Sequence, residues 1–265
     1  MRVIQNSGEK SPRILALGMF DGVHRGHREL LKTGAALKRK TGVPLRACTF
    51  DRHPMAVFRP EQAPPLLTNI PRKAFLMGRS GADEMQVIPF TRKLADRSPE
   101  EFLHRMRENV QVKAVIAGWN YTFGKGGEGT ADTLVEDGKA HSYQVIILPP
   151  YTDQNGTVIS STGIREMLAS GRIREACNCL GSPYVLSGRI REDGNCRLWV
   201  EQTGKNGGIM VPADGTYLCD LLLHDGGLIR RIPVPVEEGT VFVPLSWKPE
   251  SHADRIQISF RERIR

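Results

Sequence analysis

The chain has 265 residues, of which 40% are hydrophobic and 25% charged, as in a globular protein with one large or two modest domains. Its net charge of +8 suits two kinds of partner, nucleic acid or small phosphorylated ligands. The basic residues are spread along the chain and form no known nucleic-acid-binding motif, so we expect small-molecule substrates and no nucleic acid. The apolar runs are strand-sized, no secretory signal is apparent, and the five cysteines lack paired zinc spacing. These features predict a cytoplasmic protein with no membrane partner, and they leave its oligomeric state open.

The first predicted elements are a short buried strand, Arg13 to Gly18, and a helix, His27 to Lys40, joined by a glycine-containing turn. His24 and His27 lie at the start of this helix, and their spacing places both imidazoles on one side. Unpaired N–H groups and the helix dipole favour anions at such a position. Gly26 leaves room for a phosphate to approach the backbone. The segment therefore predicts a phosphate-binding site.

Strands and helices then alternate up to about residue 180. Further strands are expected at Leu45 to Phe50, Met85 to Pro89, Val112 to Ala117 and Tyr143 to Leu148. Further helices are expected at Ile70 to Gly78, Pro99 to Val110 and Ala131 to Ala140. This alternation predicts an α/β domain with a parallel, Rossmann-like sheet covered on both faces. Ligands bind beyond the carboxyl ends of such strands, where His24, the turn after Phe50, the Gly118 loop and the segment after Leu148 are expected to converge.

From about Pro183 the pattern changes to short strands separated by Gly, Pro and Asp. They are expected at Tyr184 to Ile190, Cys196 to Glu201, Gly208 to Val211, Thr216 to Leu223, Leu228 to Pro235, Thr240 to Val243 and Arg255 to Phe260. We therefore predict a first domain over residues 1–182 and a small antiparallel, barrel-like β domain over residues 183–265. Two short helices, Ile164 to Leu168 and Ile173 to Leu180, precede the second domain, and the linker is expected at Cys177 to Pro183.

Five stretches of the chain resemble a known family in the family's order. They are Gly18 to His27, Thr49-Phe50-Asp51-Arg52-His53-Pro54, Leu67-Thr68 with Lys73, Gly118-Trp119-Asn120-Tyr121-Thr122-Phe123-Gly124-Lys125 and Ser160-Ser161-Thr162-Gly163-Ile164-Arg165. The family is the nucleotidyltransferase module of the prokaryotic FAD synthetases, which is usually fused to a riboflavin kinase. The resemblance implies that FMN and ATP, with Mg²⁺, are converted to FAD.

The resemblance also implies a set of site residues. His24 and His27 are expected to donate to the triphosphate and the transition state without a covalent histidine intermediate, and Arg165 to fork onto phosphate oxygens. The remaining ATP and phosphate contacts are expected from Gly18, Phe20, Asp21, Gly26, Ser161 and Thr162. Flavin or nucleotide contacts are expected from His53, Asn120, Phe123 and Lys125. In this chain Arg52 stands where family members commonly have proline, and the metal ligands are unknown.

The second domain resembles the riboflavin kinase barrel only weakly. Full kinase modules carry a Gly-Phe-Pro-Thr-Ala-Asn segment whose Thr and Asn hold ATP and magnesium. Here Arg197-Leu198-Trp199-Val200-Glu201 occupies that region, so kinase activity is expected to be absent. The domain is left with three possible roles: weak flavin binding, a dimer contact, or bracing of the first domain.

The sequence thus predicts an FMN adenylyltransferase, a nucleotidyltransferase that makes FAD and pyrophosphate. Three alternatives stay open: a bifunctional riboflavin kinase and FAD synthetase, a related nucleotidyltransferase for another phosphate acceptor, and a non-catalytic flavin or nucleotide sensor.

Overall fold

The computed structural model describes residues 1–4, 10–192, 198–202, 208–223, 227–243 and 255–265. The chain divides into two compact units, one of Met1–Pro64 with Ile70–Val158 and one of Pro65–Asn69 with Ile159–Arg265. The change between them lies earlier than the boundary predicted at residue 182. The assignment of separate functional domains to residues 1–182 and 183–265 stays a prediction.

The first unit is built on a six-stranded sheet in the order β1-β4-β3-β2-β5-β6, in which every pair of neighbours is parallel. The strands are β1 (Arg2–Ile4), β2 (Pro12–Leu17), β3 (Leu45–Phe50), β4 (Glu84–Ile88), β5 (Gln111–Gly118) and β6 (Gln144–Leu148). From β2 the chain proceeds through β3 to β4 in one direction, and β5 and β6 lie in the other. The α/β prediction is confirmed, and the order reverses between β2 and β5, where such sheets bind ligands.

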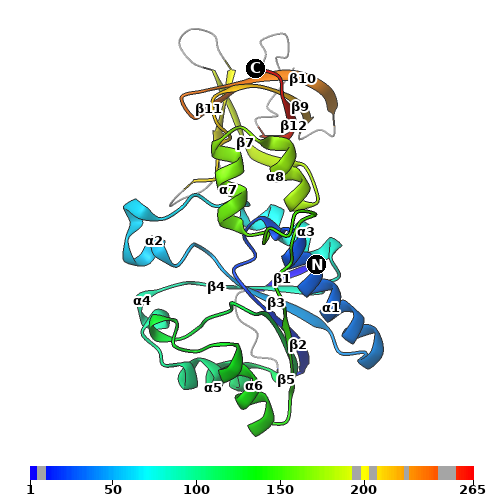
Figure 1. Cartoon of the computed structure of the whole chain (residues 1–265), viewed down its shortest axis with the longest axis vertical. Helices are drawn as coiled ribbons and strands as arrows, with labels where there is room; N and C mark the ends of the chain where they lie inside the picture. The colour runs from blue at the N-terminus through cyan, green and yellow to red at the C-terminus, as the bar shows by residue number, and fades with distance from the viewer. Residues whose placement is uncertain (5–9, 193–197, 203–207, 224–226, 244–254) are drawn as a thin grey trace. The chain divides into compact units, whose positions relative to one another are not determined.

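Helices cover both faces of this sheet (Figure 1). The helices of this unit are α1 (Arg25–Thr41), α2 (Met55–Phe58), α3 (Ile70–Arg79), α4 (Arg92–Ala95), α5 (Pro99–Asn109) and α6 (Ala131–Ala140), with short 3₁₀ turns η1 (Asp21–Val23), η2 (Pro60–Gln62) and η3 (Lys125–Gly127). Apolar residues of α1 and α3 share a core with one face, and Leu103 of α5 and Leu134 of α6 share a core with the other. Helix α5 starts where the sequence predicted, because Ser98 and Glu101 form a reciprocal capping box.

The second unit contains a closed barrel in the order β10-β11-β8-β7-β12-β9, all of whose neighbours are antiparallel. Its strands are β7 (Tyr184–Glu192), β8 (Leu198–Gln202), β9 (Gly215–Leu223), β10 (Leu228–Glu237), β11 (Thr240–Val243) and β12 (Arg255–Arg263). Helices α7 (Ser161–Ala169) and α8 (Ile173–Leu180) share one apolar core with these strands. That shared core explains why the unit begins before α7.

Three details of the predicted second domain differ from the structure. Gly208 to Val211 is not a strand, because Ile209 forms only an isolated bridge with Leu66. Cys177 to Pro183 is not a linker, because α8 extends to Leu180 and buries its apolar face in the barrel core. The start of the strand expected at Cys196 lies outside the described residues.

Candidate active site

The two histidines of the predicted phosphate site lie together at the start of α1. His24 is the N-cap, and its Nδ1 accepts a hydrogen bond from the His27 backbone N–H at 3.4 Å. The two imidazoles stack with ring centroids 3.7 Å apart. The Nδ1 atom of His27 is buried and has no hydrogen-bond partner within the part of the chain described. A buried ring nitrogen in this state costs free energy, which a hydrogen-bonding ligand would recover.

Burial sets the charge of this pair. It lowers the pKa of His24 to about 4, with a smaller contribution from the positive charge of Arg28. Burial also holds the pKa of His27 well below its usual range, reinforced by His24 and Lys73. Both imidazoles are therefore neutral near pH 7 in the free protein. Since Nδ1 of His24 is an acceptor, its proton is assigned to Nε2, which is left as a donor.

The loop before the helix shapes the space around the histidines. Phe20 adopts a left-handed backbone conformation (φ 51°), and its fully buried ring lies 5.2 Å from the ring of His27. At Gly18 a Cβ would lie 3.3 Å from the Phe20 ring, and at Gly26 a Cβ would lie 3.2 Å from the His24 ring. Both glycines thus keep the rings closely packed, and Asp21 is buried in the same turn.

A buried lysine supports this loop. Lys73 of α3 is 1% exposed, and its Nζ donates to the Met19 carbonyl at 2.9 Å and to Thr49 Oγ1 at 3.3 Å. Burial lowers its pKa to about 8, against the opposing effect of Asp21 and Asp51. Lys73 remains mainly protonated at neutral pH and places a positive charge beneath the histidine loop.

A cavity of about 530 Å³ opens beside the loop, between the sheet and α5. Gly18 and Thr49 line it at the carboxyl ends of β2 and β3, so it reaches the same sheet edge as the histidines. Its other lining residues are Leu15, Leu17, Cys48, Phe50, Gln86, Ile88, Pro89, Thr91, Leu94, Arg97, Phe102, Arg105, Met106, Asn109, Val110 and Tyr121. A lining that mixes apolar and aromatic side chains with polar ones, two arginines among them, suits a flat aromatic ligand that carries an anionic group.

Of the residues predicted to contact flavin or nucleotide, Phe123 lies nearest this cavity. Its buried ring packs on Phe102 at 5.1 Å and on Tyr121 at 5.8 Å, and both of these line the cavity. Asn120 and Lys125 are exposed, and neither they nor His53 lines the cavity. The Nδ1 of His53 instead accepts from the Met55 N–H at 3.2 Å. Contacts of these three with a ligand stay predictions.

The predicted second phosphate clamp lies in the second unit. Ser160 is the N-cap of α7, and its hydroxyl accepts from the Gly163 N–H at 3.1 Å, so Ser161 and Thr162 are the first helical residues. Arg165 Nε donates to the Pro65 carbonyl at 2.7 Å. This bond fixes one side of the guanidinium within its own unit. A role of the clamp in phosphate binding stays a prediction.

Sequence reasoning missed two parts of the site. Lys73 belongs to a motif of the resemblance but was not expected to support the loop; the signal was a lysine on the buried side of an amphipathic helix. The Cys48 and Gln86 pair of the cavity gave no signal, because it depends on the register of β3 with β4.

Comparisons with known proteins show the family of the chain. A sequence model of the FAD synthetase family matches residues 6–163. The chain is 34% identical to a bifunctional riboflavin kinase/FMN adenylyltransferase of Listeria monocytogenes over 67% of its length, but spans only 56% of that relative. It is 32% identical to an FAD synthetase of the same organism, covering 85% of this chain and 88% of the relative. In solved structures, a protein from Streptococcus pneumoniae described as a macrolide-efflux protein shares 25% identity, with a TM-score of 0.83 over 99% of this chain and 90% of that one.

No described helix combines the length and the apolar character needed to cross a bilayer. The family model matches more than half of the sequence, and an FAD synthetase matches over most of both chains. On these grounds the chain belongs to the FAD synthetase family.

Proposed function

We propose that the protein is an FMN adenylyltransferase, which makes FAD and pyrophosphate from FMN and ATP. The observation that carries the proposal is the stacked His24 and His27 pair at the N-terminus of α1, with an unsatisfied buried nitrogen on His27. In the reaction a phosphate oxygen of FMN forms a bond to the α-phosphorus of ATP. The bond from that phosphorus to the bridging oxygen breaks, and pyrophosphate leaves.

The chain's own groups stabilise the charge that develops in this step. The N–H groups at the start of α1 and the Nε2–H of His24 are donors for the triphosphate. A bound polyphosphate raises the pKa of both imidazoles and favours their protonated form when negative charge builds up. Lys73, whose Nζ donates a hydrogen bond to the Met19 carbonyl, places a positive charge behind the loop. In this proposal Ser161, Thr162 and Arg165 contribute the second set of phosphate donors.

The flavin of FMN is assigned to the cavity beside the loop. Its aromatic lining from Phe50, Phe102 and Tyr121 suits a three-ring isoalloxazine, and the opening at Gly18 leads toward the histidines. Arg97 and Arg105 give this cavity a positive field.

Mg²⁺ fits this arrangement as an ion held mainly by substrate. Among the described residues, no three His, Cys, Asp or Glu side chains gather as a metal site. Mg²⁺ commonly takes its ligands from substrate phosphates, water and one or two carboxylates, and Asp21 is the carboxylate in the histidine loop. When bound, it would neutralise charge on the phosphates.

We also propose that riboflavin kinase activity is absent. The barrel interior is filled by apolar and aromatic side chains, among them Tyr184, Tyr217 and Phe260, over the strands whose side chains are described. Part of the segment from Arg197 to Glu201, on which the sequence argument rests, lies outside the described residues. The match to 88% of an FAD synthetase supports the same conclusion. A cytoplasmic location is supported by the free thiols of Cys48, Cys177, Cys179 and Cys219.

The decisive experiment incubates the purified chain with ATP, MgCl₂ and either FMN or riboflavin, and separates the flavins by chromatography. FAD from FMN, with no FMN from riboflavin, is the expected result. FMN from riboflavin would establish the bifunctional alternative. Binding of ATP and FMN without any product would favour the sensor, and ATP binding without FMN binding would favour another phosphate acceptor.

A further inference from the structure

The floor of the cavity is set by the register of two parallel strands. Strands β3 and β4 pair Arg46 with Glu84, Cys48 with Gln86, and Phe50 with Ile88. Both members of the second and third pairs line the cavity. Along one sheet face the chain therefore places an ion pair, then a polar pair, then an apolar pair at the rim.

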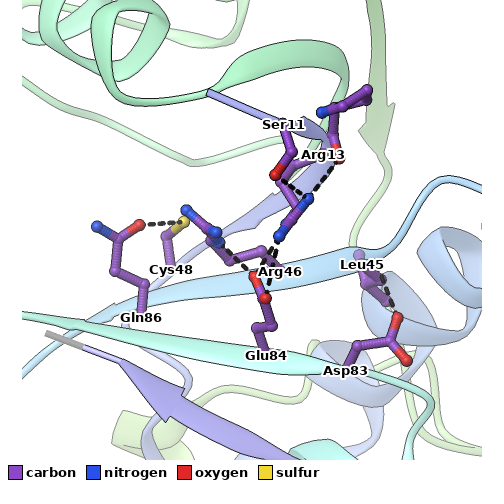
Figure 2. A network of polar contacts seen from close by, with 9 residues as sticks. Ser11, Arg13, Leu45, Arg46, Cys48, Asp83, Glu84 and Gln86 are labelled. Carbon is purple, nitrogen blue, oxygen red and sulfur yellow. Dashed lines mark hydrogen bonds and ion pairs between the residues drawn. The ribbon is translucent and has the colours of Figure 1, made fainter. Parts of the chain in front are cut away.

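The ion pair gives this floor a rigid base (Figure 2). Glu84 Oε2 accepts from Arg46 Nε at 2.8 Å and from Arg13 Nε at 3.0 Å, and Oε1 accepts from Arg13 at 3.2 Å. Although burial raises the pKa of Glu84, the hydrogen bonds from Arg13 and Arg46 hold it below its usual value. The carboxylate thus stays ionised and ties β4 to β2 and β3. Gln86 follows it by two residues on the same face, so its backbone is fixed.

Cys48 then fixes the side chain of Gln86. Its thiol donates to Gln86 Oε1 at 3.7 Å, and Figure 2 shows the amide nitrogen directed away from the sulfur. Burial raises the pKa of Cys48 to about 12, so the sulfur keeps its proton as a donor at neutral pH. Within the described residues, the Gln86 amide nitrogen makes no hydrogen bond, and Oε1 retains a second lone pair.

A partly buried amide with this capacity can hydrogen-bond a ligand that enters the cavity. The cavity that Gln86 lines also has apolar walls, from Leu15, Leu17, Met106 and Val110 among others. Isoalloxazine carries a polar edge, the pyrimidine ring, in which an N3–H lies between two carbonyl groups. A carboxamide complements that edge, because its nitrogen donates to a carbonyl while its oxygen accepts from N3–H.

We propose that Gln86 determines flavin specificity by hydrogen-bonding the pyrimidine edge of the isoalloxazine ring, and that Cys48 is its positioning residue. This inference rests on the proposed function. It orients the flavin with its pyrimidine edge on the floor formed by β3 and β4 and its dimethylbenzene edge away from it.

The test measures equilibrium binding by flavin fluorescence for FMN and for 3-methyl-FMN, in which a methyl group replaces the N3 proton. Wild-type protein is compared with Gln86→Leu, which replaces the carboxamide by an apolar side chain and loses both hydrogen bonds. Gln144→Leu is the matched control, an exposed glutamine on β6 of the same sheet. Losing two hydrogen bonds at a partly buried polar site predicts that Gln86→Leu weakens FMN binding about tenfold to a hundredfold. Cys48→Ala, which frees the Gln86 carbonyl, should weaken it less.

Wild-type protein should likewise bind 3-methyl-FMN more weakly than FMN, whereas Gln86→Leu should bind both alike. Equal affinity of the wild type for the two flavins would overturn the proposal, and that comparison needs no variant. Loss of the preference in Gln144→Leu would overturn it as well. If wild type makes FAD but Gln86→Leu binds FMN normally, only this inference fails. If wild type binds no FMN, the proposed function fails with it.

Discussion

The clearest energetic consequence of the site is that the buried His24 makes folding sensitive to acid. Lowering its pKa from 6.5 to about 4 corresponds to about 3 kcal/mol. Between these two values the unfolded chain binds a proton that the native chain does not. The free energy of unfolding therefore falls as the pH falls through this range. About 2 kcal/mol of that loss is expected between neutral pH and about pH 5.

The perturbation is His24→Asn, which removes the titrating ring but keeps an acceptor for the N-cap bond to His27. Urea unfolding at a series of pH values should show the wild type losing about 2 kcal/mol more than the variant on going to about pH 5. His104→Asn, the same substitution at an exposed histidine of α5, is the matched control. Identical slopes for wild type and His24→Asn would refute the reasoning. Saturating ATP should reduce the difference, because phosphate stabilises the protonated ring.

Three further predictions concern activity and the buried charges. His27→Ala should slow FAD formation about a hundredfold, because one charge-stabilising donor is lost, whereas His141→Ala, at an exposed histidine, should not slow it. Equal rates of FAD formation in the two variants would remove His27 from the mechanism. Arg165→Lys should raise the KM for ATP more than that for FMN, since lysine cannot fork onto phosphate, and an equal rise in both would assign Arg165 to holding Pro65. Glu84→Gln should lower the free energy of unfolding by about 3 to 5 kcal/mol, measured with urea, because two buried guanidiniums lose their carboxylate; a change below about 1 kcal/mol would contradict this.

Elements with strong periodicity or clear caps were predictable from the sequence. Strand Leu45–Phe50 and helices Ala131–Ala140 and Ile173–Leu180 match their predicted limits. Shorter elements were missed, because α2 and α4 are single turns and β1 has only three residues. Such segments are too short to show a period, and they are ordered by what they pack against.

The histidine pair was predictable because its chemistry depends on local order: strand, turn, helix. Its charge state was not, because both rings are made neutral by burial, which depends on the residues that pack around them in the fold. The cavity floor could not be predicted from the sequence either. Cys48 and Gln86 meet only because β3 and β4 pair in one particular register, which a sequence pattern of two buried strands does not specify.

The short segment Pro65–Asn69 has a consequence for biosynthesis. It lies early in the sequence, yet it belongs to the second unit, where Leu66 exchanges backbone hydrogen bonds with Gly208 and Met210. On the ribosome this segment is synthesised long before Gly208 and Met210. Its backbone hydrogen bonds to these residues can therefore form only after the later part of the chain has been made. Contacts of such long sequence separation form slowly. The barrel unit is therefore expected to be completed last, and a fragment that begins at Ile159 lacks one segment of this unit.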